Sequence, residues 1–229
     1  LSDETQGMLD QFIKLSETIP ITVEELSRIA TLGAQMGIGA SGIVKFTETV
    51  SQFSSITGMS ADTIAEKFGR IAQLTKLESD QMSNLGSSIA YAGVNAVATE
   101  PQIMSLAESI AAVSERVGLL PAEVIGLSTS LASLGVPAEQ ARGVFTRLFG
   151  KIDRAVGDGG PTLAKFAKIA GVSADEFKTK WGEAGESYDL IRGILNGVNA
   201  SGKDLTKVFD DLGIVETREI NTLTRLAKN

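Results

Sequence analysis

The sequence contains no cysteine and no histidine among its 229 residues. Without cysteine the chain forms neither a disulfide framework nor a thiolate metal site, and nothing indicates its redox compartment. Without histidine it lacks imidazole metal ligands and the base of Ser-His-Asp and Cys-His catalysis. We therefore expect a structural or mechanical protein, not an enzyme, with no catalytic residues, no cofactor site and no metal site.

Aromatic residues are also scarce, at 5%, and the chain has a single tryptophan. Hydrophobic residues still make up 43% of the sequence, so alanine, leucine, isoleucine and valine must form most of the core. The length suits one large domain or two small ones. Because the sequence begins at Leu1 rather than at methionine, we expect it to be a piece of a longer polypeptide.

The formal net charge of −7 argues against general nucleic-acid binding. Residues 1–115 carry 14 acids and 6 bases, a net of −8, whereas residues 116–229 carry 14 acids and 15 bases, a net of +1. The simpler interpretation is two solvated faces of different sign, and head-to-tail contact between molecules is the alternative.

No membrane segment is expected. Leu1–Gln11 lacks the basic start and apolar core of a signal peptide. Ile29–Val44 and the 19 residues Gln81–Thr99 carry no charge, but about half of the second stretch is polar or glycine. A membrane-spanning helix needs about 20 mostly apolar residues.

Apolar residues recur with the 3.6-residue period of an α-helix along almost the whole chain. In the clearest case, Pro137–Val156, five apolar residues share one face and three basic residues share another. The apolar face consists of Phe145, Leu148, Phe149, Ile152 and Val156, and the basic face of Arg147, Lys151 and Arg154. No run alternates like a strand. The sequence predicts an all-α fold of roughly ten short helices with glycine- and proline-punctuated corners, in an irregular bundle or array.

Capping residues predict where these helices begin and end. Thr22–Glu25 has the pattern of a capping box that opens a helix ending near Gly37, and Gly171–Glu176 contains a second one. Ser201 is expected to open a helix that Gly213 closes. The other predicted boundaries lie at Gly58 and Ser60, Thr99–Pro101, Gly118, Pro121 and Gly135.

One corner occurs three times, at Gly58–Asp62, Gly135–Glu139 and Gly171–Asp175. Each reads glycine, an apolar residue, a cap or proline, alanine and an acid. A left-handed glycine, an apolar residue packed under the turn and an acid at the positive end of the next helix explain the pattern. Because the spacings of 77 and 36 residues are irregular, we interpret a reused corner rather than a solenoid period.

Gly157–Pro161 is the one loop rich in helix breakers. It predicts a hinge between an N-terminal helical part, residues 1–156, and a C-terminal helical part, residues 162–229. One continuous domain is the alternative.

Three groups of residues resemble chemical sites only in part. Gly157–Gly160 resembles a phosphate loop but lacks the preceding strand and the following Lys-Ser/Thr. Asp153 and Asp158 lack the alternating ligands and final glutamate of a calcium loop. Asp210 and Asp211 would point about 100° apart on a helix, which favours solvated carboxylates over an acid–base pair.

Other residues have a structural and a functional interpretation. Trp181 is expected to fill a core or a helix joint, with a ligand platform as the alternative. The basic face of Pro137–Val156 is expected to be solvated, with docking of an acidic partner as the alternative. Asn199–Ser201 fits a glycosylation acceptor, but Ser201 is better explained as a helix cap.

Small residues gather in two places where helices could approach closely. The simpler interpretation is loop glycine plus ordinary close packing, and the alternative is conditional membrane insertion or tight self-association in a confined space. The first group contains Gly33, Ala34, Gly37, Gly39, Ala40, Ser41 and Gly42, and the second Gly86, Ala90 and Gly93.

Several segments resemble the tail tape-measure proteins of long-tailed bacteriophages, most densely from Leu106 to Asn229. Leu134–Leu148 (LGVPAEQARGVFTRL) is similar to the most recognisable motif of that family, although ARGV stands where the family has Ala-Gly-Thr-Ala. The likeness continues through Phe166–Trp181 and Asp210–Ile220, and the order of the motifs carries it. Ala107–Leu134 resembles that family's run of helices broken at Gly-Leu-Leu-Pro-Ala-Glu, and Ala72–Ala92 shows a less distinctive similarity.

The resemblance implies a ruler that sets tail length inside the polymerising tube and leaves ahead of the DNA at infection. Its implied partners are other copies of itself, the tail tube protein, tail assembly chaperones, tail tip proteins and, during ejection, the host membrane, with no specific nucleic-acid binding. The implied location is the lumen of the tail tube in the virion, and the host cytoplasm during assembly. A generic α-helical binding module and a membrane-active segment that aids genome delivery remain alternatives.

Overall fold

The structure is a computed structural model and describes residues 3–202 and 204–228. In these residues thirteen α-helices follow one another without any strand, which confirms the predicted all-α fold. The count exceeds the predicted ten in part because α10 and α12 have only seven residues each. The α-helices are α1 (Asp3–Thr18), α2 (Val23–Gln35), α3 (Ala40–Thr57), α4 (Ala61–Thr75), α5 (Met82–Asn95), α6 (Glu100–Ser114), α7 (Pro121–Ser133), α8 (Ala138–Asp158), α9 (Gly160–Ala170), α10 (Ala174–Lys180), α11 (Glu186–Ala200), α12 (Leu205–Asp211) and α13 (Thr217–Ala227), with short 3-10 helices η1 (Ser79–Gln81) and η2 (Glu115–Val117).

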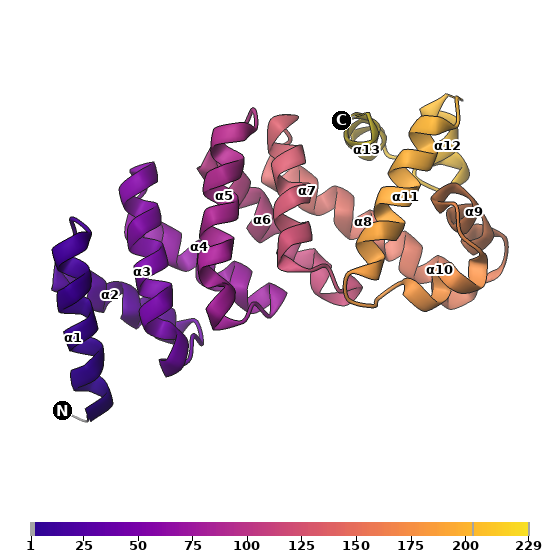
Figure 1. The fold of residues 1–229 in the computed structure, drawn as a ribbon. Coiled ribbons are helices and arrows are strands. Elements are labelled where there is room, and N and C mark those ends of the chain that lie inside the picture. Colours follow the sequence, from indigo (N-terminus) through magenta and orange to yellow (C-terminus); the bar gives the residue numbers. More distant parts are fainter. Residues whose placement is uncertain (1–2, 203, 229) are drawn as a thin grey trace.

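The first eight α-helices form an elongated array of two layers (Figure 1). α1, α3, α5 and α7 stand side by side in one layer, and α2, α4, α6 and α8 form the other. Every helix of the array packs against the next helix of its own layer. The array therefore grows along one direction, and each hairpin buries one side of the hairpin before it.

The array has a period of 38 or 39 residues. Each even-numbered helix begins after an N-cap at an equivalent position: Thr22, Ser60, Thr99 and Pro137. The corners at Gly58 and Gly135, 77 residues apart, thus lie two repeats apart. Our interpretation of that spacing as irregular is wrong. Four hairpins stack as in an α-solenoid, and the period is hidden because the corners before Thr22 and Thr99 lack the glycine.

Neighbouring helices of the first layer run parallel in a fixed register. A Cβ added at Gly42 of α3 would lie 2.2 Å from the Ser79 hydroxyl oxygen, in η1 directly before α5. Seven residues later, a Cβ added at Gly86 of α5 would lie 2.8 Å from Cγ2 of Thr49. Both pairs are 37 residues apart in the chain, so positions that lie within one or two residues of equivalence in successive repeats meet.

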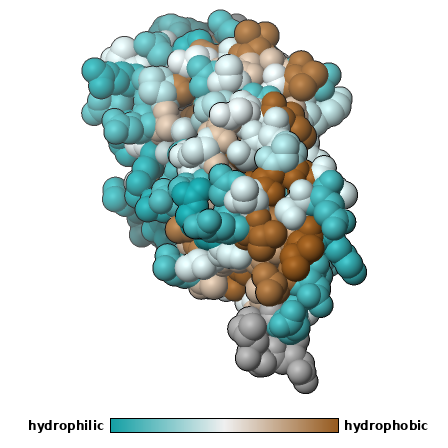
Figure 2. Space-filling view, turned by 90° about the vertical axis from the view of Figure 1, so that its left-hand side faces the viewer, coloured by the Kyte–Doolittle hydropathy of each residue, from teal (hydrophilic) through white to brown (hydrophobic). Residues whose placement is uncertain are grey.

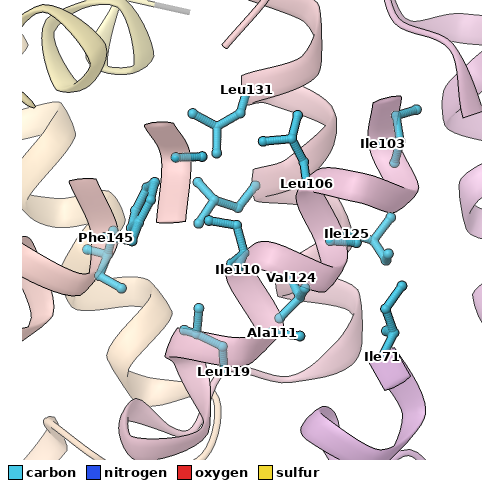
Figure 3. Close-up of a cluster of buried hydrophobic side chains, with 14 of the residues drawn as sticks. Ile71, Ile103, Leu106, Ile110, Ala111, Leu119, Val124, Ile125, Leu131 and Phe145 are labelled. Carbon is cyan, nitrogen blue, oxygen red and sulfur yellow. The ribbon is translucent and has the colours of Figure 1, made fainter. Parts of the chain in front are cut away.

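Side-chain size alternates between repeats in the buried layer of even-numbered helices. The equivalent positions Ala30, Phe68, Ala107 and Phe145 are all buried. A large side chain in one repeat fills the space left by a small one in the next, which gives close packing without strain. Figure 3 shows part of this core, where Leu106, Ile110, Leu131 and Phe145 from α6, α7 and α8 lie together.

The three glycine corners have the predicted geometry. Gly58, Gly135 and Gly171 have φ angles of 70°, 65° and 80°. After the last two, the apolar residue donates its backbone N–H to the carbonyl oxygen five residues earlier, at 3.0 Å in both cases. This hydrogen bond is the Schellman closure of a helix end. The corner prediction is therefore confirmed.

Of the two predicted capping boxes, only the first forms completely. Thr22 N–H donates to the Glu25 carboxylate at 3.0 Å, and Glu25 N–H donates back to the Thr22 hydroxyl at 3.2 Å. At the second, Glu176 N–H donates to the Ser173 hydroxyl at 3.1 Å, but the Glu176 carboxylate pairs with Lys180 at 3.1 Å. The prediction of a full box there is wrong, because an i,i+4 ion pair competes for the glutamate.

The predicted helix start at Ser201 is also wrong. Ser201 closes α11, and its hydroxyl donates to the Val198 carbonyl at 2.8 Å. α12 begins after Asp204, whose carboxylate accepts the Thr206 N–H at 3.0 Å. A carboxylate is a good N-cap and also complements the positive end of the helix.

Beyond α8 the two-layer repeat gives way to a cluster of α9 to α13. α9 and α13 both contact α8, and α11 contacts both α9 and α13. Gly157–Pro161 forms the corner between α8 and α9, with Gly159 and Gly160 at φ angles of 70° and 72°. The cluster thus covers the end of the array formed by α8, whereas the end formed by α1 stays open (Figure 1).

Candidate functional site

The described residues contain no group of three or more carboxylates that could hold a metal ion. Several side chains that the sequence singled out lie instead in two joints. These joints attach the cluster formed by helices α9 through α13 to α8, at the end of the array. We call them the Trp181 joint and the α8–α13 joint.

The Trp181 joint connects α10 to α8. The indole ring stacks on Phe177, with centroids 6.2 Å apart and planes 18° apart, and meets Phe149 edge-on at 6.0 Å. The indole N–H donates to the Asp153 carboxylate at 2.7 Å. The prediction of a helix joint at Trp181 is confirmed. Asp153, which accepts the indole N–H, is one of the two aspartates that do not match a calcium loop.

Asp153 extends this joint to a third element. Its other carboxylate oxygen pairs with Arg116 of η2 at 2.6 Å. One side chain of α8 therefore ties α10 to the turn between α6 and α7. This role explains an inward-facing acid on α8 without any metal chemistry.

The α8–α13 joint uses the basic face predicted on α8. Arg147 Nε donates to the Glu219 carboxylate of α13 at 3.3 Å, and Lys151 Nζ donates to the Gly213 carbonyl. Arg154 lines, with Lys151, a cavity of about 190 Å³ beside the α8–α9 corner. The basic face of α8, which we expected to be solvated, is therefore only partly solvated. Arg147 and Lys151 bind groups of their own chain rather than an acidic partner.

Glu219 is the most unusual titratable group of the structure. Its side chain is fully buried, and its second oxygen has no hydrogen-bond partner. Burial raises the pKa of Glu219 above the ordinary value of 4.5, although the Arg147 guanidinium acts in the opposite direction. No local sequence pattern indicates this contact, because the partner of Glu219 lies 72 residues away.

Glu108 of α6 has the opposite character. Burial acts to raise its pKa, but contacts with Lys67 at 3.0 Å and Arg70 at 2.9 Å, both from α4, outweigh burial and lower the pKa below 4.5. This triad bridges two successive repeats of the second layer. The sequence did not predict this triad, because nothing in α4 or α6 alone indicates that Lys67 and Arg70 lie close to Glu108.

The remaining predicted residues lie as follows. Asp210 and Asp211 are exposed at the end of α12, as expected for solvated carboxylates. Asn199 is exposed near the end of α11. The phosphate-loop pattern at Gly157–Gly160 forms a corner between two helices rather than a strand-to-helix turn.

Small residues do mark close approaches between helices. A Cβ at Gly33 of α2 would lie 2.7 Å from Phe46 of α3, and one at Gly93 would lie 2.4 Å from Glu100. Gly37 and Gly39 belong to the α2–α3 corner instead. Across residues 3–202 and 204–228, no helix is both long and apolar enough to span a membrane.

The tightest crossing was missed from the sequence. A Cβ at Gly197 of α11 would lie 1.9 Å from the Ile169 carbonyl oxygen, and one at Gly193 would lie 2.8 Å from that of Ala170. The two glycines are four residues apart and therefore share a face of α11, a spacing that could have been recognised.

Two exposed apolar features remain on the array. Tyr91, Val94 and Val97, near the α5–α6 corner, are 71%, 81% and 87% exposed, and Ile56 at the end of α3 is 73% exposed. The second feature is an apolar groove at the open end, between α1, α2 and the start of α3. Figure 2 looks at this end and shows hydrophobic surface running between hydrophilic flanks.

Comparison with known families decides the identity. The family described as phage-related minor tail protein matches residues 9–213, which is most of the chain. The chain belongs to this family. This minor tail protein is therefore a structural component of a phage tail, and the virion is where such a component functions. Neither the curated proteins nor the solved structures give a significant match to it.

Proposed function

We propose that this minor tail protein is a segment of a tape-measure protein, which sets tail length during assembly and leaves the tail ahead of the DNA. The observation that supports this proposal most is the array of equivalent hairpins. In an array, length is proportional to the number of repeats, so each 38- or 39-residue unit adds one fixed increment. A protein that measures needs this proportionality.

The proposed role is mechanical rather than catalytic. The sequence lacks the cysteine and histidine that most nucleophilic mechanisms use. The buried acid Glu219, whose pKa is raised by burial, is engaged with Arg147 in a helix joint. Polar side chains of this minor tail protein thus hold helices together.

The proposed location is the lumen of the tail tube, with the tube protein, tail assembly chaperones, tail tip proteins and further copies of the chain as partners. A net charge of −7 suits this path, because an acidic chain does not bind the DNA that follows it. Contact with the host membrane during ejection is part of the same proposal.

Tail length is the decisive measurement. We would delete the codons for residues 1–229 in frame and measure tails by electron microscopy, beside a second deletion of one repeat, residues 60–98. If the chain is stretched into continuous helix in the tail, the losses are about 340 Å and about 60 Å at about 1.5 Å per residue. If the array stays folded, one repeat contributes only about 10 Å, the distance between packed helices.

Either loss supports the ruler, and the size of the loss per repeat, about 60 Å or about 10 Å, tells which form the chain has in the tail. Tails of unchanged length in both deletions would contradict the proposal. Loss of tails altogether would indicate a docking role, to be separated by complementation with the intact segment on a plasmid.

The exposed cluster of Tyr91, Val94 and Val97 near the α5–α6 corner, together with exposed Ile56 at the end of α3, favours docking to a protein or a membrane as a second function. Replacing Val94 and Val97 with serine would abolish binding of the purified chain to liposomes if the cluster contacts lipid. If the parent chain does not bind liposomes at any pH, the membrane role is excluded and a protein partner remains.

A further inference from the structure

The groove at the open end of the array has a volume of about 470 Å³. Its walls are Met8, Leu9 and Phe12 from α1 and Ser27, Thr31 and Ala34 from α2. None of these side chains is charged, and the only polar groups are two hydroxyls.

Repeat symmetry identifies what this surface is. Ser27, Thr31 and Ala34 are exposed on α2, whereas the positions 38 residues later in α4, Ala65, Gly69 and Ala72, are all buried. The preceding hairpin covers them. A Cβ at Gly69 would lie 2.2 Å from the sulfur of Met36, which caps α2.

The third hairpin, α5–α6, has the same buried stripe on its second helix. Met104 and Ala111 of α6 occupy the same stripe and are both fully buried. Between them, Glu108 receives Lys67 and Arg70 from the preceding α4. In the second and third hairpins, therefore, the surface that corresponds to the groove is an interface between two repeats, whereas at the equivalent positions of α8 Arg142 and Thr146 are exposed and Phe149 is buried.

The chemistry of the open end is that of an interior. Terminal repeats of solenoid proteins carry a polar outer face, because nothing stacks on them. At the other end of the array the last repeat does not need a polar outer face, because α9 and α13 pack on α8 and cover it. Within the part of the chain that the structure describes, the α1–α2 end has neither charged side chains lining the groove nor a covering element.

We propose that this groove is the interface for a further helical hairpin of the same array, contributed by the polypeptide directly N-terminal to α1. It would pack on α1–α2 as α1–α2 packs on α3–α4, with small side chains facing Ala34 and Thr31. The inference comes from the groove and the repeat, and it does not rest on the tail-length function.

A second copy of the chain fits this end less well. The exposed charged side chains of α1 and α2 include Asp10, Glu17, Glu24 and Glu25 against Lys14 and Arg28, and Arg28 is already paired with Asp62 of α4 at 2.6 Å. Two such ends brought together would place like charges opposite each other. A preceding hairpin avoids this because its own flanks are free to be neutral or basic.

The test compares residues 1–229 with a version extended by about 40 residues, one repeat, encoded before Leu1. Hydrogen–deuterium exchange of α1 and α2 and the melting temperature are measured for both. Each version is also made with Ala34→Glu, in the groove, and with Gln35→Glu, an equally exposed neighbour that adds the same charge outside the groove.

We expect the extension to slow exchange in α2 by about tenfold or more, because the stripe becomes an interface. In the extended chain Ala34→Glu should then lower the melting temperature by roughly 5 °C, while Gln35→Glu leaves it nearly unchanged. In residues 1–229 alone both variants should melt like the parent, which shows that neither disturbs folding by itself.

Three results would overturn the proposal. The first is that no helical hairpin is encoded before Leu1, and the second is that the extension leaves exchange in α2 unchanged. The third is that residues 1–229 form a dimer that Ala34→Glu dissociates, since a second copy would then occupy the groove. None of these outcomes bears on the tail lengths of the deletion phages, so the two proposals fail independently.

Discussion

At the scale of single residues, a buried glutamate and a half-buried one acquire opposite properties from their surroundings. Glu219 lies in the α8–α13 joint with one cationic contact and an unpartnered oxygen, and burial raises its pKa. Glu108 lies between α4 and α6 with two cationic contacts, which lower its pKa despite burial. Their effects on stability should therefore have opposite pH dependence.

Glu219 should destabilise the fold at neutral pH. A raised pKa in the folded state means that its contribution to stability is fully present below the ordinary pKa and is lost as the pH rises through the folded-state value. Glu219→Gln removes this loss and keeps an acceptor for Arg147. We expect the variant to exceed the parent in free energy of unfolding by about 1 kcal/mol near pH 8, and by little near pH 4, measured by urea denaturation at each pH.

Glu108→Gln is the matched control for that measurement. A lowered pKa contributes stability above the ordinary value, and this contribution is lost as the pH falls through the folded-state value. The variant should lose about 1–2 kcal/mol near pH 7 and much less near pH 4. If both glutamine variants changed stability in the same direction at every pH, the assignment of opposite shifts would be wrong.

Single residues were predictable where their partners are close in the sequence. The Thr22–Glu25 capping box and the left-handed Gly135 follow from three or four neighbouring positions, and both are confirmed. Glu219 and Glu108 depend on partners 72 and about 40 residues away. No local pattern records such a contact, since the amphipathic period gives only the face on which a charge lies.

At the scale of elements, the α9–α11 crossing is the closest approach between helices. Gly193 and Gly197 let the backbone of α9 rest on α11, and any side chain at Gly197 meets the Ile169 carbonyl. The crossing holds the cluster that covers α8. Its geometry therefore determines how well the end of the array is closed.

Gly197→Ala should loosen this crossing. The added methyl group would lie 1.9 Å from a backbone oxygen, so the helices must move apart. We expect a loss of about 1–3 kcal/mol of stability, measured by chemical denaturation.

The same substitution at Gly150 is the control. A Cβ there meets nothing within 4 Å, and the residue lies inside α8. Gly150→Ala should raise stability by about 0.5–1 kcal/mol through helix propensity alone. An equal effect of the two variants would show that the α9–α11 contact is not close in solution.

Elements were predicted well because their ends carry local signals, and the failures occurred where two signals compete. At Ser201 and Asp204, two possible caps stand three residues apart, and the carboxylate opens the helix. At Glu176, an i,i+4 lysine competes with the return bond of a capping box. Choosing between such options needs the neighbouring helices, which fix where each helix must end.

At the scale of the whole molecule, the repeat was the main feature hidden from the sequence. Only two of four equivalent corners carry glycine, and buried side chains alternate between alanine and phenylalanine from one repeat to the next. Alternation of this kind doubles the apparent period, because complementary sizes pack better than identical ones. The 77-residue spacing was therefore visible while the repeat itself was not.

The hinge predicted at Gly157–Pro161 would separate two domains only if the parts on either side of it fold and unfold independently. Fragment 162–229 contains α9 to α13, but its Trp181 packs on Phe149 and donates its indole N–H to Asp153. Both α8 residues lie in the other fragment. The cluster should therefore depend on α8 for folding, as an end-capping unit of a solenoid depends on its neighbour.

We expect fragment 162–229 alone to show little helical signal by circular dichroism and no cooperative melting, because short isolated helices are marginal in water. Fragment 1–161 retains the four hairpins and should melt cooperatively, but at a lower temperature than the whole chain, and bind a hydrophobic dye through the uncovered side of α8. Mixing the two should restore part of the missing signal. Cooperative melting of 162–229 by itself would instead mean two domains joined at Gly157–Pro161, because each side would then have a core that does not need the other.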